Sequence, residues 1–309
     1  MATAKSGVET RIASVNATAI DEAKALIAAG HCVAVPTETV YGLAADATNG
    51  EAVAGIYAAK GRPGFNPLIV HIPNLAAAER IAVFGAGARE LAARYWPGPL
   101  TLVMSLKPDN GIASLVAAGL PTIALRVPAH PAMQALLRAT GKPLAAPSAN
   151  ASGSISPTRA EHVLKSLRGR IPLILDAGPT AVGLESTIVA VDADGNLRLL
   201  RPGPVDLGLK LSQSSGIEAP GQLASHYAPA KPLRLDAMTA EADEWLIGFG
   251  DVMGDATLSA SGNMLEAAAR LFAALHEAEE SLKPRIAVAP IPADGLGQAI
   301  NDRLRRAAA

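Results

Sequence analysis

The chain has 309 residues, enough for one large domain or two ordinary ones, and its 27 basic and 28 acidic side chains give a formal net charge of -1. This balance excludes a globally basic nucleic-acid coat and an acidic disordered chain. Half of the residues are hydrophobic but only 3% are aromatic, so we expect a core of Ala, Val, Leu and Ile. The single cysteine, Cys32, excludes an internal disulfide framework and a cysteine-rich zinc site, and we interpret it as a buried strand residue.

The chain carries no targeting or membrane signal that we recognise. Residues 1–11 are polar and lack the apolar stretch of a secretory signal. No apolar run approaches the ~20 residues of a membrane span. We therefore expect a cytoplasmic protein without membrane association.

Helical and strand patterns alternate through the first two thirds of the chain. The spacing predicts helices at 21–29, 51–60, 86–95, 131–140 and 158–167, and strands at 31–36, 68–72, 100–106, 122–127, 173–175 and 186–191. Residues 37–43 are expected to form a polar turn. This alternation predicts an α/β domain with a twisted, open, mostly parallel or mixed sheet.

The pattern changes after Arg201-Pro-Gly-Pro204. Residues 207–232 are rich in Gly, Ser and Pro without a clear period, which indicates a linker. Beyond it we expect strands at 233–235, 245–249 and 285–291 and helices at 263–282 and 297–307. The predicted organisation is a domain at 1–206, a linker at 207–232 and a smaller α/β domain at 233–309.

Familiar catalytic motifs are absent from the sequence. It has no Gly-x4-Gly-Lys-Ser/Thr phosphate loop, no His-Glu-x-x-His zinc motif and no Gly-x-Ser-x-Gly nucleophile motif. Its six histidines are scattered, so we predict no metal site built by the protein.

Polar side chains instead follow several apolar strands. One such segment is Pro36-Thr-Glu-Thr-Val-Tyr-Gly-Leu43, and another begins at Leu144-Ala-Ala-Pro-Ser148 and runs to Thr158. Open α/β sheets bind ligands at such strand ends, and small residues let backbone N–H groups approach a ligand. Turns that only cap the following segment are the alternative for both.

A third segment contains Lys60 and Arg62. Two residues apart in extended backbone, their side chains would point to one face roughly 7 Å apart, a spacing that suits different phosphates of one polyphosphate. A solvated charge pair is the alternative. His71, which ends the following apolar strand, fits either a ligand site or the core.

Together these segments resemble the threonylcarbamoyl-AMP synthase family, whose catalytic part is the YrdC-type domain. The resemblance is carried by 36–43, Lys60-Gly-Arg-Pro63, Asn66-Pro-Leu-Ile-Val-His71, Trp96-Pro-Gly-Pro-Leu-Thr101, Arg126-Val-Pro128, Ala146-Pro-Ser-Ala-Asn150 and Glu185-Ser-Thr-Ile-Val189. Ser225-His-Tyr-Ala-Pro229 and the tail resemble the long form of the family. The resemblance implies a YrdC-like twisted open sheet with helices, followed by a smaller Rossmann-like α/β domain.

The resemblance also implies a reaction. L-threonine, bicarbonate and ATP give threonylcarbamoyl-AMP and pyrophosphate, and a partner complex then transfers the threonylcarbamoyl group to tRNA. The chain would thus be a nucleotidyltransferase of tRNA processing, with Mg²⁺ accompanying the ATP. No stable nucleic-acid binding of its own is expected.

The family's site residues carry over to matching positions. The implied threonine pocket consists of Thr39, His71, Arg126, Ala146 and Ser186. The implied ATP side consists of Lys60, Arg62, Asn66, Thr122, Ser148, Asn150, Ser156, Arg201 and the linker residue Tyr227. Of these, Lys60, Arg62, Ser148 and Asn150 form the family's Lys-x-Arg and Ser-x-Asn signature and are the predicted catalytic residues. We further expect the linker to fold over the ATP side, with Tyr227 against the nucleotide; a passive tether is the alternative.

Two other functions are alternatives to a threonylcarbamoyl-AMP synthase. A hydrogenase-maturation protein that uses carbamoyl phosphate contains a similar domain, but it adds cysteine-rich zinc fingers, which one cysteine excludes. A non-catalytic nucleotide- or RNA-binding module of the same type is the second alternative. Residues 1–206 carry 18 basic and 15 acidic side chains, a basic excess too small to bind a nucleic-acid backbone strongly. Aromatic residues are also too scarce for extensive base stacking.

Overall fold

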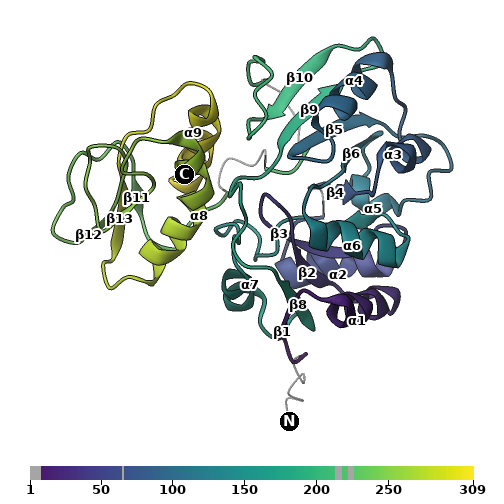
Figure 1. Ribbon diagram of the computed structural model, residues 1–309, viewed down its shortest axis with the longest axis horizontal. Coiled ribbons are helices and arrows are strands. Elements are labelled where there is room, and N and C mark those ends of the chain that lie inside the picture. Colours follow the sequence, from purple (N-terminus) through teal and green to yellow (C-terminus); the bar gives the residue numbers. More distant parts are fainter. Residues whose placement is uncertain (1–7, 65, 213–217, 222–225) are drawn as a thin grey trace.

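A computed structural model describes residues 8–64, 66–212, 218–221 and 226–309, so parts of the predicted linker (213–217 and 222–225) lie outside the described residues. The described chain forms two sheets with helices packed on them, one for each predicted domain (Figure 1). The larger sheet has ten strands in the order β1-β8-β2-β3-β7-β4-β6-β5-β9-β10. It mixes parallel pairs with antiparallel pairs, as the alternating pattern predicts.

The strands of the larger sheet are short and mostly buried. Their bounds are β1 Arg11–Ser14, β2 Val33–Pro36, β3 Tyr41–Asp46, β4 Ile69–His71, β5 Leu100–Ser105, β6 Thr122–Arg126, β7 Leu144–Ala145, β8 Leu173–Asp176, β9 Thr187–Val191 and β10 Leu197–Arg201. Alternate residues serve opposite faces of the sheet. Val33 and Val35 pack with α1 and α6, whereas Ala34 belongs to the core cluster on the other face.

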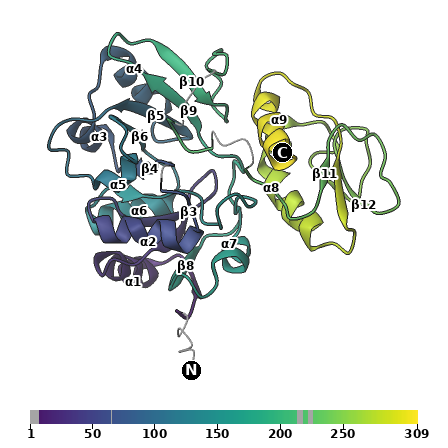
Figure 2. The same cartoon turned by 180° about the vertical axis from the view of Figure 1, so that it is seen from behind.

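Helices cover both faces of this sheet (Figures 1 and 2). Their bounds are α1 Ala17–Ala28, α2 Gly50–Lys60, α3 Leu75–Ile81, α4 Ala86–Tyr95, α5 Ser114–Ala117, α6 Pro131–Thr140 and α7 Ala160–Leu167. Asparagine side chains cap α1, α2 and α3 by accepting hydrogen bonds from first-turn N–H groups. Gly61 ends α2 in the left-handed conformation, with φ of 59°, which glycine adopts without steric cost.

The second domain has a small all-parallel sheet in the order β11-β14-β12-β13. Its strands are β11 Leu233–Arg234, β12 Glu244–Gly248, β13 Ala256–Thr257 and β14 Arg285–Val288, and its helices are α8 Met264–Glu280 and α9 Leu296–Ala307. Leu271, Phe272 and Leu275 of α8 pack with Ile300 and Leu304 of α9 in one core cluster. The two helices lie on the side of this domain that faces the first domain (Figure 1). This parallel α/β arrangement agrees with the Rossmann-like expectation.

Several elements differ from the sequence expectations. Residues 41–43 begin β3 rather than complete a turn, because Tyr41–Asp46 pairs with β2 in an antiparallel hairpin. The sequence patterns also missed β1, β10, β13, α3 and α5, whereas β7 lies at the strand end expected at Leu144. Most of these are two to five residues long, too short to display a period. The position of β1 depends on pairing with β8, far along the chain.

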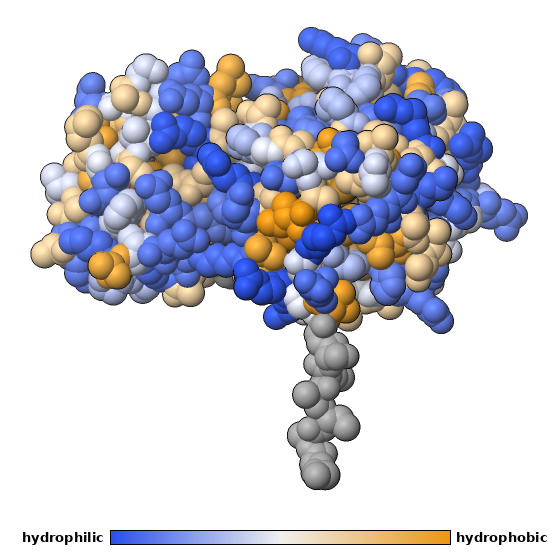
Figure 3. Space-filling view, turned by 60° about the horizontal axis from the view of Figure 1, so that its bottom comes forward, coloured by the Kyte–Doolittle hydropathy of each residue, from blue (hydrophilic) through white to orange (hydrophobic). Residues whose placement is uncertain are grey.

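No helix within the described residues is long and apolar enough to cross a membrane. The face in Figure 3 is largely hydrophilic, with apolar side chains in small groups.

Candidate functional site

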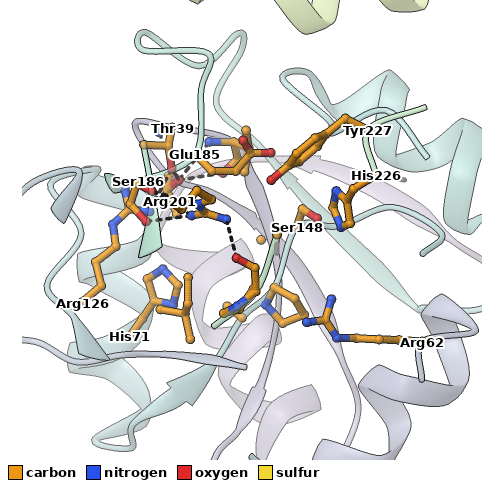
Figure 4. A pocket seen from close by; sticks show the side chains of 18 residues that line it. Thr39, Arg62, His71, Arg126, Ser148, Glu185, Ser186, Arg201, His226 and Tyr227 are labelled. Atoms are coloured by element: carbon orange, nitrogen blue, oxygen red, sulfur yellow. Dashed lines mark hydrogen bonds between the residues drawn. The ribbon is translucent and has the colours of Figure 1, made fainter. Parts of the chain in front are cut away.

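A pocket of about 520 Å³, counted out to its mouth, lies where loops from the larger sheet meet the linker (Figure 4). Strand register brings part of its wall together. His71 and Arg126 end the parallel strands β4 and β6 and are direct neighbours in the ladder.

All five residues predicted to hold threonine line this pocket: Thr39, His71, Arg126, Ala146 and Ser186. They come from positions far apart in the chain, so the fold is what unites them. Apart from Ala146, they are polar side chains of 3% exposure or less. We call this group the threonine wall.

Arg126 is fixed by three acceptors. Its Nε donates to the carbonyl oxygen of Gly98 at 3.2 Å, its Nη1 to the hydroxyl of Thr39 at 3.0 Å, and its Nη2 to the carboxylate of Glu38 at 2.6 Å. A guanidinium has five N–H groups, so two remain. Two N–H groups are the number that a bidentate carboxylate accepts.

His71 is a neutral neighbour of this cation. Burial, and then the charge of Arg126, lower its pKa well below the usual histidine value. Its Nδ1 is buried and has no hydrogen-bond partner among the described residues. The ring therefore adds polarity to the threonine wall without adding charge.

Four of the residues predicted on the ATP side also line the pocket: Arg62, Ser148, Arg201 and Tyr227. Arg62 donates from Nε to the carbonyl of Asn66 and from Nη2 to that of Pro67, at 3.2 and 2.9 Å. Arg201 donates from Nε and Nη2 to the carbonyl of Ser186, at 3.1 and 2.9 Å. Both guanidinium groups thus bind neutral acceptors and keep their charge for an anion.

Lys60 lies outside the lining of the pocket. Its Nζ donates to the carbonyls of Ser148 and Asn150 at 2.6 and 2.5 Å, and burial lowers its pKa well below the usual lysine value. The expectation that Lys60 and Arg62 extend from one strand face is wrong. Lys60 is the last residue of α2, and the left-handed Gly61 separates it from Arg62.

The remaining predicted ATP-side residues also lie outside the lining: Asn66, Thr122, Asn150 and Ser156. Asn150 donates to the carbonyl of Ser154 and so shapes the loop that carries Ser148. Thr122 starts β6, at the end of the strand opposite Arg126. Asn66 is 1% exposed, and neither the nitrogen nor the oxygen of its side-chain amide has a hydrogen-bond partner among the described residues. Buried polar groups are normally hydrogen-bonded, so this amide is free to bind a ligand.

Sequence reasoning left several lining residues unassigned. Glu185 and His226 belong to segments that carry the family resemblance, but no role was given to them. Glu185 is the one acidic side chain among the described lining residues. Its carboxylate accepts from the hydroxyl of Ser156 at 2.5 Å and from Nε of Arg303, in α9, at 2.9 Å.

Tyr227 reaches the pocket from the linker, as predicted for its position. It is 1% exposed and adopts a left-handed backbone with φ of 65°, which is strained for a bulky residue. Its ring lies 5.6 Å from that of Phe272 in α8. The part of the linker at 226–227 is therefore packed between the pocket and the second domain.

Comparison with known proteins agrees with this geometry. Residues 25–203 match the family model of Sua5, YciO and YrdC, described as telomere recombination, and residues 190–309 match the threonylcarbamoyl-AMP synthase C-terminal domain. The threonylcarbamoyl-AMP synthase of Bacillus subtilis is 41% identical, over 96% of this chain and 94% of its own length. The chain belongs to the threonylcarbamoyl-AMP synthase family. It is an enzyme that makes threonylcarbamoyl-AMP, a nucleotidyl transfer.

Two further comparisons cover both domains. The threonylcarbamoyl-AMP synthase of Pyrococcus abyssi is 36% identical over 93% of this chain and 95% of its own length. The crystal structure of P. abyssi Sua5 complexed with L-threonine superposes with a TM-score of 0.87 at 33% identity, covering 97% of each chain. The family resemblance read from the sequence, and the two-part α/β fold it implies, are thereby confirmed.

Proposed function

We propose that the pocket joins L-threonine, bicarbonate and ATP to give threonylcarbamoyl-AMP and pyrophosphate, with threonine on the wall that contains Arg126 and the nucleotide on the wall that contains Arg62 and Arg201. One observation carries this assignment: residues predicted separately for the two substrates line a single pocket. Arg201 of the ATP set bonds directly to Ser186 of the threonine set. The two substrates would therefore meet within this pocket.

In this proposal the two free N–H groups of Arg126 bind the threonine carboxylate. Ser186 and Thr39 lie on the same wall and offer hydroxyls to the amine or hydroxyl side of threonine. Ser186 already shares a hydrogen bond of 2.7 Å with Thr101, which fixes its orientation. A polar wall of this kind favours threonine over apolar amino acids of the same shape.

The chemistry needs no nucleophile from the protein. The threonine amine adds to bicarbonate with loss of water and gives a carbamate. A carbamate oxygen then forms a bond to the α-phosphorus of ATP, and the bond to the pyrophosphate oxygen breaks. Catalysis rests on positioning and on cations beside the phosphates, the roles we assign to Arg62 and Arg201.

We assign supporting roles to other residues predicted on the ATP side. Lys60 holds the loop of Ser148, and Asn150 shapes the same loop. Asn66 offers its unpartnered amide to the nucleotide. Tyr227 closes the nucleotide side and excludes water from the carbamate and the adenylate. Thr122 and Ser156 stay predictions for the ATP side.

Mg²⁺ is proposed to enter with ATP as part of that substrate. The described residues hold no cluster of three metal-ligating side chains. Both oxygens of Glu185, the acidic residue of the described lining, already accept hydrogen bonds from Ser156 and Arg303. The donor set thus does not fit a metal held by the protein, and the phosphates would supply its ligands.

For the cellular context we propose a cytoplasmic enzyme that passes its product to a complex that modifies tRNA, without stable nucleic-acid binding of its own. The near-neutral charge supports the last point.

The test is pyrophosphate release by the purified full chain, with each substrate omitted in turn. We expect release only when threonine, bicarbonate and ATP are present together, and formation of threonylcarbamoyl-AMP in equal amount. ATP binding without such release would favour the non-catalytic module instead.

A further inference from the structure

Arg303 is a fully buried arginine that the second domain presents to the first. It lies in α9 and has a relative exposure of 0%. Its Nε donates to Glu185 at 2.9 Å and its Nη1 to Asp302 at 2.8 Å, while its Nη2 is buried without a partner among the described residues. Its guanidinium carbon lies 5.2 Å from the centre of the Tyr227 ring, which shields it from water.

The partner of Arg303 is Glu185, the one acidic side chain in the described lining of the pocket. Glu185 is 6% exposed and lines the pocket on the side of Arg201 (Figure 4). Burial is the largest single influence and acts to raise its pKa. The charges of Arg303 and Arg201, together with the hydrogen bonds from Ser156 and Arg303, outweigh burial, so the pKa of Glu185 lies below its usual value. The carboxylate is therefore ionised at neutral pH.

An ionised carboxylate in the pocket lining repels a nucleotide polyphosphate. Both are negative, and charges in a buried pocket interact more strongly than charges in water. Arg201 lies nearby, but its N–H groups are directed to the carbonyls of Ser186 and Pro220 and to the hydroxyl of Ser186. The group that bonds directly to the Glu185 carboxylate as a cation is Arg303.

We propose that Arg303 is a positioning residue for nucleotide binding: it neutralises Glu185, so that the wall beside Arg201 accepts a polyphosphate. The inference rests on the proposed function, because it requires the nucleotide to bind on this wall. It gives the second domain a direct electrostatic part in the site. A tie that only holds the two domains together is the competing explanation.

The test compares Arg303→Met, Glu185→Gln and the double variant in the full chain. Calorimetry measures the affinity for a non-hydrolysable ATP analogue with Mg²⁺, and separately for threonine. We expect Arg303→Met to weaken analogue binding at least tenfold, because it leaves Glu185 as an unpaired negative charge. The double variant has the same net charge in this wall as the natural protein, so we expect its affinity to return to within threefold.

Two controls make the comparison specific. Arg305→Met removes an exposed arginine from the same helix and should leave analogue affinity unchanged. Threonine has no net charge at neutral pH, so its affinity should change less than threefold in every variant. Asp302 keeps a partner in all of them, because it also accepts from Arg306 at 3.1 Å.

The inference is overturned if Arg303→Met binds the analogue as tightly as the natural protein. It is also overturned if the double variant stays at least tenfold weaker, since a purely structural tie predicts that result. The second comparison holds even if Arg303→Met does not fold. Failure of the proposed function would look different: the natural protein would release no pyrophosphate with all three substrates present.

Discussion

Replacing Arg126 with lysine tests the threonine wall most directly. The natural side chain spends three N–H groups on Gly98, Thr39 and Glu38 and has two left for a ligand. Lysine keeps the positive charge but has three N–H groups on one nitrogen, too few for these partners and a bidentate carboxylate. We expect the loss of at least one hydrogen bond between charged groups, about 1.5–3 kcal/mol, which corresponds to a roughly 10- to 150-fold weaker threonine affinity.

The assay is threonine binding by calorimetry, followed by the dependence of initial pyrophosphate release on threonine. Affinity for ATP alone should stay within about twofold, because Arg126 belongs to the threonine wall. Arg138→Lys, an exposed change in α6, is the matched control. A melting temperature close to that of the natural protein checks that the pair with Glu38 has not collapsed. Threonine affinity within threefold of the natural protein would refute the assignment of Arg126 to the carboxylate.

Three other changes probe different parts of the molecule. Lys60→Met removes the side-chain nitrogen that donates to two backbone carbonyls of the 148–150 loop, so both the melting temperature and the nucleotide affinity should fall; if neither changes, the anchoring role is wrong. Tyr227→Phe removes a buried hydroxyl that has no partner among the described residues; we expect the KM for ATP to rise about 2- to 12-fold, equivalent to about 0.5–1.5 kcal/mol, and an unchanged KM would show that the hydroxyl does not serve the nucleotide. The stacked rings of His162 and His276 have pKa values lowered, mainly by burial, to about 4 and about 3. Because the unfolded chain binds these protons near pH 6.5, stability should fall as pH drops from about 6.5 toward 4; His162→Phe should flatten that slope in melting temperature, and an equally steep slope would contradict the linkage.

The sequence was informative where local pattern and chemistry coincide. The helices at 86–95 and 131–140 begin and end where predicted, since Gly85, the Trp96-Pro-Gly-Pro99 segment and Gly141 punctuate them. The five residues predicted for threonine all line one pocket, and each of them lies in a motif of the family; their role in binding threonine stays a prediction. Local pattern alone could not predict that these motifs, far apart in the chain, meet in one pocket. That depends on register, such as the pairing of His71 with Arg126 across parallel strands.

Predictions from spacing failed where the assumed backbone was wrong. Two residues of separation place side chains on one face only in an extended chain, and Lys60 is helical. The ion pair between Glu185 and Arg303 could not be predicted from the sequence, for a different reason. It joins residues 118 apart, and Arg303 is preceded by Asp302 and followed by two further arginines within three positions, a pattern typical of an exposed helix end.

The charges of the pocket explain why it can accept reactants without large rearrangement. Arg126 is held by Glu38, Glu185 is balanced by Arg303, and His71 is kept neutral by burial and by the adjacent cation. Because Arg126 and Glu185 already have partners of opposite charge, substrate binding leaves neither of them as an isolated buried charge. The donors that remain unused are fixed in place before any ligand arrives. Fixed donors cost no reorganisation when negative charge develops on the phosphates, which is the form of catalysis that a reaction without a protein nucleophile requires.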